Sequence, residues 1–144
     1  MKILIESNIL LDVALRREAF LKDSAAVIDW AELNPKQDSV AWHSLSNLAY
    51  IVKQDARSFI ADLLVFVEVA AGDTATVRQA LAMPIKGMED ALQASAAIHF
   101  GADIIVTRDI AGFKKLPIRA MSPAESAKTY MPDSNDGDGD GEKG

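Results

Sequence analysis

The amino-acid sequence predicts an α/β domain with a mostly parallel sheet. Short apolar runs alternate with helical stretches over about 130 residues, which is the pattern of repeated strand–helix–strand units. Ile104, Ile105 and Val106 form a run of three β-branched residues, and such runs are typical of strands that are buried on both faces. Because crossovers between parallel strands are nearly always right-handed, we expect helices on both faces of the sheet.

Five short runs have the composition of strands. The first is rich in β-branched residues, and the third, Val-Glu-Val-Ala, is ended by Gly72 and Asp73. The strands are expected at 2–6, 38–42, 67–70, 103–107 and 118–121.

Capping residues and helix breakers mark the helices between these runs. Ser7 and Asn8 are good caps for a short first helix, and Ser44 is a candidate cap for a later one. Gly101 suits the left-handed position that ends a helix, and Pro123 suits the first turn of the last helix. Before Pro123, helices are expected over 10–15, 23–32, 45–52, 56–66, 74–83 and 87–100.

Composition excludes several classes of function. The chain has no cysteine, so it has no disulfide framework, thiolate zinc site or cysteine nucleophile. Its net charge of −6 argues against broad, non-specific binding to phosphate backbones, although it allows an acidic site that holds a metal ion. No apolar run approaches the length that crosses a bilayer, and we expect a cytoplasmic protein.

One domain is expected over residues 1–130, followed by a disordered acidic tail over 131–144. The tail contains four Asp, one Glu and one Lys together with Pro, Gly, Ser and Asn, so it has almost nothing to bury.

Three acidic residues are expected at one edge of the sheet. Glu6 ends the first strand, Asp109 follows the fourth, and Asp90 lies in the first turn of the helix that leads into the fourth strand. Ligands of open parallel sheets bind beyond the carboxyl ends of the strands. Like charges gathered there are costly unless a cation neutralises them, and oxygen ligands without sulfur or imidazole suit Mg²⁺ or Mn²⁺. Such an ion supports the hydrolysis of phosphodiesters.

The sequence resembles the PIN-domain family. Residues 5–12, Ile-Glu-Ser-Asn-Ile-Leu-Leu-Asp, are similar to the opening motif of these domains. Residues 88–94, Met-Glu-Asp-Ala-Leu-Gln-Ala, resemble the segment around the third acidic position of the family. Residues 101–109, Gly-Ala-Asp-Ile-Ile-Val-Thr-Arg-Asp, with Phe113 soon after, resemble the closing strand-and-acid motif. The most similar branch contains the VapC-like toxin ribonucleases of toxin–antitoxin modules and their uncharacterised relatives.

The resemblance implies a five-stranded parallel sheet between two layers of helices. It also implies an Mg²⁺- or Mn²⁺-dependent endoribonuclease that acts on RNA, often as a homodimer bound by a small antitoxin protein. Carried over by position, Glu6, Asp90 and Asp109 take the catalytic and metal-binding roles, and Asn8 and Thr107 give polar support. Asn47 stands where many PIN domains carry a helix glutamate. Among the basic residues near this edge, we expect Arg108 to contact the substrate.

Two departures from the family pattern keep an alternative open. Family members normally have aspartate where this chain has Glu6, and many have an acid where it has Asn47. The longer side chain of Glu6 displaces its carboxylate, and a small misplacement of a catalytic group can cost about 100-fold in rate. The alternative is therefore a catalytically weakened PIN domain that acts as a protein- or RNA-binding module.

Two less specific interpretations also remain. Asp90 and Asp109 can serve only as charges or caps at helix starts. A phosphorylatable receiver domain also gathers acids around Mg²⁺ in an α/β sheet, but the residues that follow the third and fifth strands fit it poorly.

Overall fold

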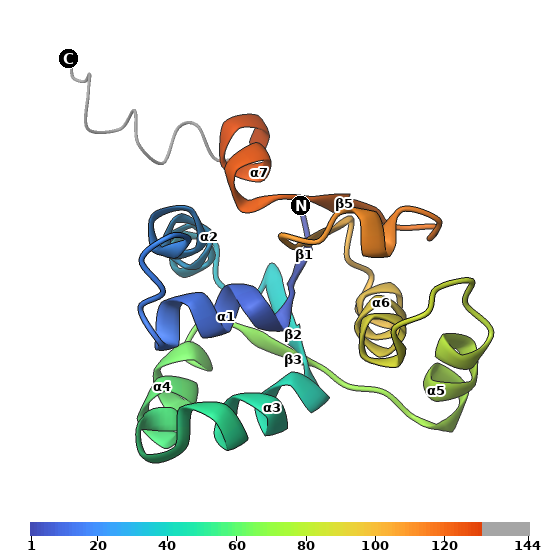
Figure 1. Ribbon diagram of the computed structural model, residues 1–144, viewed down its shortest axis with the longest axis horizontal. Coiled ribbons are helices and arrows are strands. Elements are labelled where there is room, and N and C mark those ends of the chain that lie inside the picture. Colours follow the sequence, from blue (N-terminus) through green and yellow to red (C-terminus); the bar gives the residue numbers. More distant parts are fainter. Residues whose placement is uncertain (131–144) are drawn as a thin grey trace.

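The computed structural model describes residues 1–130 and contains a five-stranded parallel sheet. Its strands follow the spatial order β3-β2-β1-β4-β5 (Figure 1). The predicted fold class, a three-layer α/β/α domain with five parallel strands, is confirmed. The predicted tail, 131–144, lies outside the described residues. The strands are β1 Ile3–Ile5, β2 Asp38–Ala41, β3 Glu68–Ala70, β4 Ile104–Val106 and β5 Arg119–Met121.

The strand order rules out the receiver-domain interpretation. Receiver domains have the flavodoxin-like order 2-1-3-4-5, in which the third strand lies beside the first. Here β1 pairs with β2 on one side and with β4 on the other, and β3 lies at an edge of the sheet. The carboxyl ends of β1 and β4 are therefore neighbours, with Ile5 opposite Val106.

Helices cover both faces of the sheet (Figure 1). One layer contains α1, α2, α3, α4 and α7, and the other contains α5 and α6. No helix within residues 1–130 is long and apolar enough to cross a membrane. The helices are α1 Ser7–Ala14, α2 Leu21–Leu33, α3 Trp42–Val52, α4 Ala56–Leu63, α5 Thr74–Leu81, α6 Met88–Phe100 and α7 Pro123–Tyr130, with 3₁₀ turns η1 Lys53–Asp55 and η2 Ala111–Phe113.

The strand side chains divide the core into two clusters, one on each face of the sheet. Ile3 and Ile5 belong to the cluster under α1 to α4 and α7, whereas Leu4 belongs to the cluster under α6. Successive side chains of a strand point to opposite faces, so a continuously apolar strand is needed when both faces are covered. The burial of the apolar run in β4 follows from this arrangement.

Two helix starts differ from the sequence prediction. The N-cap of α1 is Glu6, rather than Ser7 or Asn8, because the Glu6 side chain reaches round to accept the backbone N–H of Asn8. Helix α3 begins at Trp42, with Ala41 as an N-cap that makes no side-chain bond. Ser44 lies within this helix and does not cap it; its hydroxyl contacts the Ser7 hydroxyl at 2.6 Å in the interior.

Asp38 should make the stability of the protein fall as the pH rises. Its side chain is fully buried at the start of β2, and neither carboxylate oxygen has a hydrogen-bond partner within residues 1–130. Burial, with the nearby negative charge of Glu68, raises the pKa of Asp38 from 3.8 to about 7. Because the folded state holds this proton more tightly than the unfolded chain does, the stabilising effect is complete below pH 3.8 and is lost as the pH rises to 7.

We expect the free energy of unfolding to fall by about 1 kcal/mol per pH unit between pH 5 and 7, relative to Asp38→Asn. Urea unfolding of both proteins at several pH values measures this difference. The exposed Asp62→Asn is the matched control and should follow the wild type. If the free energies of unfolding of the wild type and Asp38→Asn differed by a constant amount from pH 5 to 8, the expectation would be contradicted.

Candidate active site at the carboxyl edge of the sheet

Glu6 is held at the junction of β1 and α1. Only 4% of the residue is exposed. Its Oε2 accepts the backbone N–H of Asn8 at 3.0 Å and lies 3.4 Å from the Asn8 amide nitrogen Nδ2. Its Oε1 accepts the Thr107 hydroxyl at 3.2 Å. Both carboxylate oxygens are therefore fixed by groups that the sequence analysis assigned to polar support.

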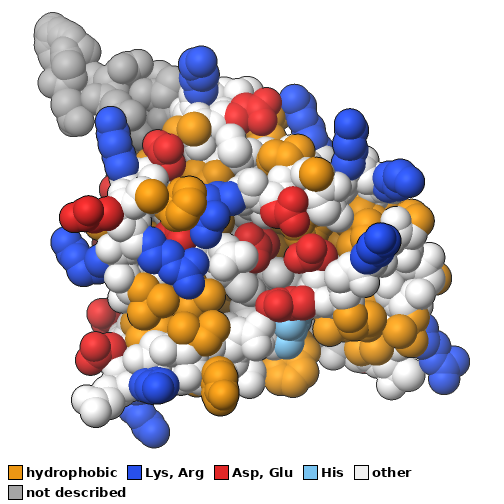
Figure 2. Space-filling view, in the orientation of Figure 1, with side chains coloured by type: hydrophobic (Ala, Val, Ile, Leu, Met, Phe, Trp, Pro, Cys, Tyr) orange, Lys and Arg blue, Asp and Glu red, His pale blue; other side chains and the backbone are white. Residues whose placement is uncertain are grey.

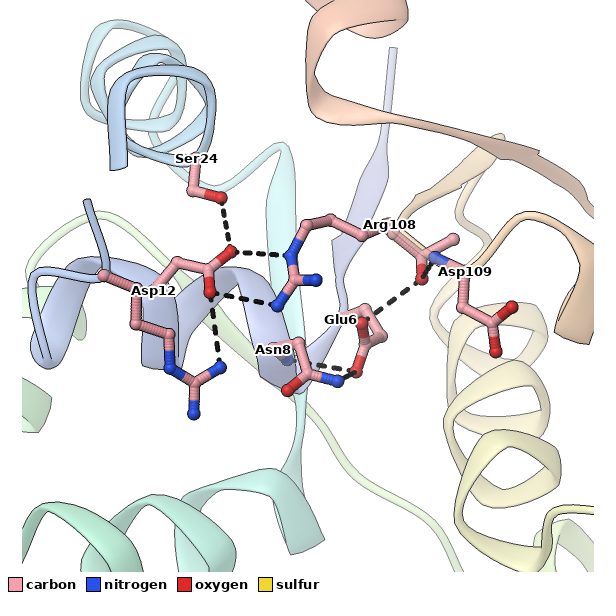
Figure 3. A network of polar contacts seen from close by, with 8 residues as sticks. Glu6, Asn8, Asp12, Ser24, Arg108 and Asp109 are labelled. Carbon is pink, nitrogen blue, oxygen red and sulfur yellow. Dashed lines mark hydrogen bonds and ion pairs between the residues drawn. The ribbon is translucent and has the colours of Figure 1, made fainter. Parts of the chain in front are cut away.

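Thr107 also connects Glu6 to Asp109. The Thr107 Oγ1 that donates to Glu6 accepts the backbone N–H of Asp109 at 3.0 Å. Asp109 Oδ1 in turn accepts the backbone N–H of Gly112 at 3.1 Å, which closes the turn after β4. The Asp109 side chain is thus presented at the surface by a loop that is fixed to the end of β1 (Figure 3).

Asp90 interacts electrostatically with both of the other acids, Glu6 and Asp109. Burial raises the pKa of Asp90, and the negative charges of Asp109 and Glu89 raise it further. Burial also raises the pKa of Glu6, and the charge of Asp90 contributes to that rise, against hydrogen bonds from Asn8 and the side chains of Gln93 and Thr107. Asp109, Glu89 and Glu6, the acids that these charge interactions connect to Asp90, are thus its neighbours.

Gly112 marks a space that Asp90 and Asp109 share. A Cβ atom on Gly112 would lie 2.6 Å from Asp109 Oδ2 and 3.2 Å from Asp90 Oδ2. Both oxygens therefore approach one point on this loop. Glycine leaves that space open, whereas any other residue would place a carbon atom against the two carboxylates.

Two cavities adjoin Asp90. One, of about 270 Å³, is lined by residues that include Glu6, Asn47, Glu89 and Asp90. The other, of about 480 Å³, is lined by residues that include Asp90 and Asp109. Figure 2 shows acidic side chains gathered near the middle of this face of the molecule.

The three predicted acids thus approach one another in pairs. Glu6 and Asp109 line different cavities, and Asp90 lines both. Within residues 1–130, no three histidine or acidic side chains stand close enough together to hold a metal ion as they are placed. Glu6, Asp90 and Asp109 nevertheless offer oxygen donors alone and have no Lys or Arg ion pair in the described part of the chain, so they form a donor set that suits a hard divalent cation.

Comparison with known proteins decides the family. The family model described as the PIN domain matches residues 2–111, which is most of the chain. The chain belongs to the PIN-domain family. A comparison with curated proteins finds no significant match.

The fold of this PIN domain is similar to that of a solved toxin–antitoxin structure. A chain in the crystal structure of VapBC2 from Rickettsia felis, bound to a DNA fragment from their promoter, superposes with a TM-score of 0.67. The match is 20% identical in sequence and covers 85% of this chain and 98% of the other. At this identity the likeness establishes the fold.

Asn47, for which the resemblance to PIN domains suggests the position of a helix glutamate, binds a carboxylate in this structure. Its Nδ2 donates to Glu89 Oε2 at 2.6 Å, and the Ser7 hydroxyl lies 3.5 Å from the same oxygen. Glu89 is a third acid in the lining of the cavity that Glu6 and Asp90 line. Glu89 was not among the predicted site residues, although its place beside Asp90 at the start of a helix was the available signal.

Arg108 does not face the acidic group. Its Nε donates to Asp12 Oδ2 at 2.9 Å and its Nη2 donates to Asp12 Oδ1 at 3.1 Å, so the two side chains form a bidentate ion pair (Figure 3). The guanidinium carbon lies 3.7 Å from the centre of the Phe20 ring. Ser24 and Arg17 also donate to Asp12, which is completely buried. The expected contact of Arg108 with substrate is therefore not favoured by this geometry.

Gln93 is a further residue that sequence reasoning missed. It is fully buried on α6, one turn after Asp90, and its Oε1 accepts the backbone N–H of Ser7 at 3.1 Å. The bond connects the helix that carries Asp90 to the start of α1, where Glu6 is the N-cap. The signal that could have identified it was a glutamine within residues 91–97, a run that is otherwise small or apolar.

Proposed function

We propose that this PIN domain is a divalent-cation-dependent endoribonuclease that hydrolyses phosphodiester bonds in RNA. The observation that carries the proposal is the space beside Gly112, which the carboxylates of Asp90 and Asp109 both approach. Glu6 lines the cavity on the other side of Asp90. Like charges in such proximity are stabilised by a cation, and carboxylate oxygens are the ligands that Mg²⁺ and Mn²⁺ prefer.

Glu6, Asp90 and Asp109 would hold the ion. A bound Mg²⁺ or Mn²⁺ supplies charge neutralisation for the phosphodiester and activates water as a nucleophile at neutral pH. The Asn8 backbone N–H favours the ionised form of Glu6, which is the form that binds cations. Thr107 orients Glu6 and the Asp109 backbone together, so the separation of these two residues is set by one side chain.

One observation favours the alternative of a weakened, RNA- or protein-binding domain. Both oxygens of Glu6 already accept hydrogen bonds within the chain, and the three acids approach one another in pairs. An ion would have to draw the carboxylates together against these bonds. A site that binds the cation weakly, or that binds it without cleaving RNA, would follow from this arrangement.

The test is a titration of Mg²⁺ and of Mn²⁺ against cleavage of a labelled single-stranded RNA, with cation binding measured in parallel by calorimetry. We expect the wild type to cleave RNA only with the cation present. Asp90→Asn should bind it at least 10-fold more weakly and lose cleavage by 1,000-fold or more, whereas the exposed Asp62→Asn should match the wild type. Cation binding without cleavage would support the weakened domain, and cleavage that survives Asp90→Asn would refute the site assignment.

We further propose that the protein acts in the cytoplasm as the toxin of a toxin–antitoxin pair, as a homodimer neutralised by a small antitoxin. The likeness of the fold to a chain of the VapBC2 structure supports this role. Exposed aromatic side chains on α3 also support a protein partner, because Trp42 is 58% exposed and Tyr50 is 83% exposed. Coexpression with the product of an adjacent reading frame, followed by copurification, tests the pairing.

A further inference from the structure

The cavity on the Asp109 side of the site has a basic wall. Three lysines, Lys86, Lys114 and Lys115, line the cavity of about 480 Å³ together with Asp90 and Asp109. All three lysines are exposed, and none of them forms an ion pair within residues 1–130. Positive and negative side chains thus line one cavity without forming ion pairs with one another.

Two loops position these lysines. Lys86 immediately precedes Gly87, the N-cap of α6, and so lies next to the helix turn that carries Asp90. Lys114 follows η2, the short turn that contains Gly112, and Lys115 is the next residue. The same backbone segments that place Asp90 and Asp109 therefore place the lysines beside them. In Figure 2, basic side chains lie on both sides of the acidic group and above it.

The cavity on the other side of Asp90 is different in charge. This cavity has a volume of about 270 Å³, and no lysine or arginine lines it. Its lining consists of Glu6, Glu89 and Asp90 with uncharged residues such as Asn8 and Ile51. Arg17 and Arg108 are both bonded to Asp12, and neither lines this cavity. Among the residues that line the two cavities, the cationic side chains are therefore confined to the Asp109 side.

We propose that Lys86, Lys114 and Lys115 form a phosphate-binding subsite that holds the RNA backbone on one side of the scissile bond only. This inference rests on the proposed nuclease function and adds to it the side of the scissile bond on which the RNA is held. Lysine side chains contribute affinity to nucleic acids mainly through contacts with the phosphates. On the other side of Asp90, the cavity has no cationic side chain in its lining, so the phosphates of the RNA would face only acids and neutral groups there.

The first experiment compares two triple variants of equal charge. Lys86→Gln/Lys114→Gln/Lys115→Gln removes the basic wall, and Lys22→Gln/Lys53→Gln/Lys128→Gln removes three exposed lysines elsewhere. We expect the first variant to raise the KM for a short single-stranded RNA at least 10-fold with kcat within threefold, and the control to stay within twofold on both. The slope of log(kcat/KM) against log salt should become shallower by about 2 for the first variant, as expected for three lost contacts with a single strand.

The second experiment tests the polarity. RNAs are prepared with neutral methylphosphonate linkages on one side of the cleaved bond or on the other. Neutral linkages on one side should raise the wild-type KM as much as the loss of the three lysines does, whereas those on the other side should change it less than twofold. The triple lysine variant should respond to neither substitution by more than twofold.

The outcomes separate this inference from the proposed function. If the wild type cleaves RNA and the lysine variant has an unchanged KM, or if both sides of the substrate respond equally, the inference is wrong and the nuclease function stands. If the wild type cleaves no RNA, the nuclease function is wrong. Fluorescence anisotropy of the same oligonucleotides then measures binding directly, and equal affinity of the two triple variants overturns the subsite.

Discussion

Replacing Gly112 by alanine should reduce cation-dependent RNA cleavage by at least about 100-fold while leaving the fold almost unchanged. The new Cβ would lie 2.6 Å from Asp109 Oδ2, a distance that forces the carboxylate to move. It would also lie 3.2 Å from Asp90 Oδ2. A displacement of about 1 Å in a catalytic group is enough for a loss of this size.

The stability of Gly112→Ala should stay within about 1 kcal/mol of the wild type. Gly101 is the only glycine with a positive φ among the described residues, so the Gly112 backbone accepts alanine without strain. The nearest atom to the new Cβ is the end of an exposed side chain that can turn away. Cleavage rates and thermal unfolding, measured on the same preparation, separate the two effects.

Gly87→Ala is the graded control for this prediction. Its Cβ would approach Asp90 Oδ2 at 3.2 Å and would not come near Asp109, so the loss of activity should be smaller. Equal activity of Gly112→Ala and the wild type would show that the position of Asp109 does not matter for the reaction. Such a result would remove Asp109 from the proposed site.

Replacing Arg108 by alanine should destabilise the protein by about 3 kcal/mol. Asp12 is completely buried, and Arg108 makes two of its four side-chain hydrogen bonds. Removal of one partner leaves a buried carboxylate with only Ser24 and the longer contact of Arg17 at 3.3 Å, and uncompensated buried charges of this kind typically cost about 3–5 kcal/mol. Urea unfolding at pH 7 measures the loss.

The matched variants for Arg108 are Arg108→Lys and the double variant Asp12→Asn/Arg108→Ala. Lysine keeps the charge but loses the bidentate geometry, so it should recover only part of the stability. The free energy of unfolding of the double variant should fall by less than the sum of the falls in the two single variants, because no buried charge is left without its partner. A stable Arg108→Ala protein with a raised KM for RNA would instead support the contact with substrate that the sequence suggested.

The positions of Thr107 and Glu6 show how far the sequence could lead into the site. Both residues end strands of the predicted parallel sheet, and the pairing of β1 with β4 makes them neighbours. The motif around Asp90 placed that acid at the start of a helix, as observed. What the motifs could not give is the direction of each side chain, and so the approach of the acids in pairs, with Asp90 between the other two, appears only in the structure.

Arg108 and Lys114 illustrate the same limit for the basic residues. In the sequence, Arg108 stands between two site residues and is the natural candidate for substrate contact. In the structure, a buried carboxylate 96 positions away binds it, whereas Lys114 lines the cavity beside Asp109. Burial makes an unpaired Asp12 so costly that the pair is formed even though Arg108 is also near the site.

By itself, the sequence determined the parallel α/β fold and the family, and it predicted the three acids of the proposed site, because alternating apolar runs and short motifs are local in the chain. The tertiary structure alone decided which charges are neutralised. Asp12 pairs with Arg108, Glu89 binds Asn47, and Lys86 and Lys114 stay without an acidic partner in the described part of the chain. The physical reason is that ion pairs and hydrogen bonds depend on distance and burial between distant segments, which no local pattern specifies.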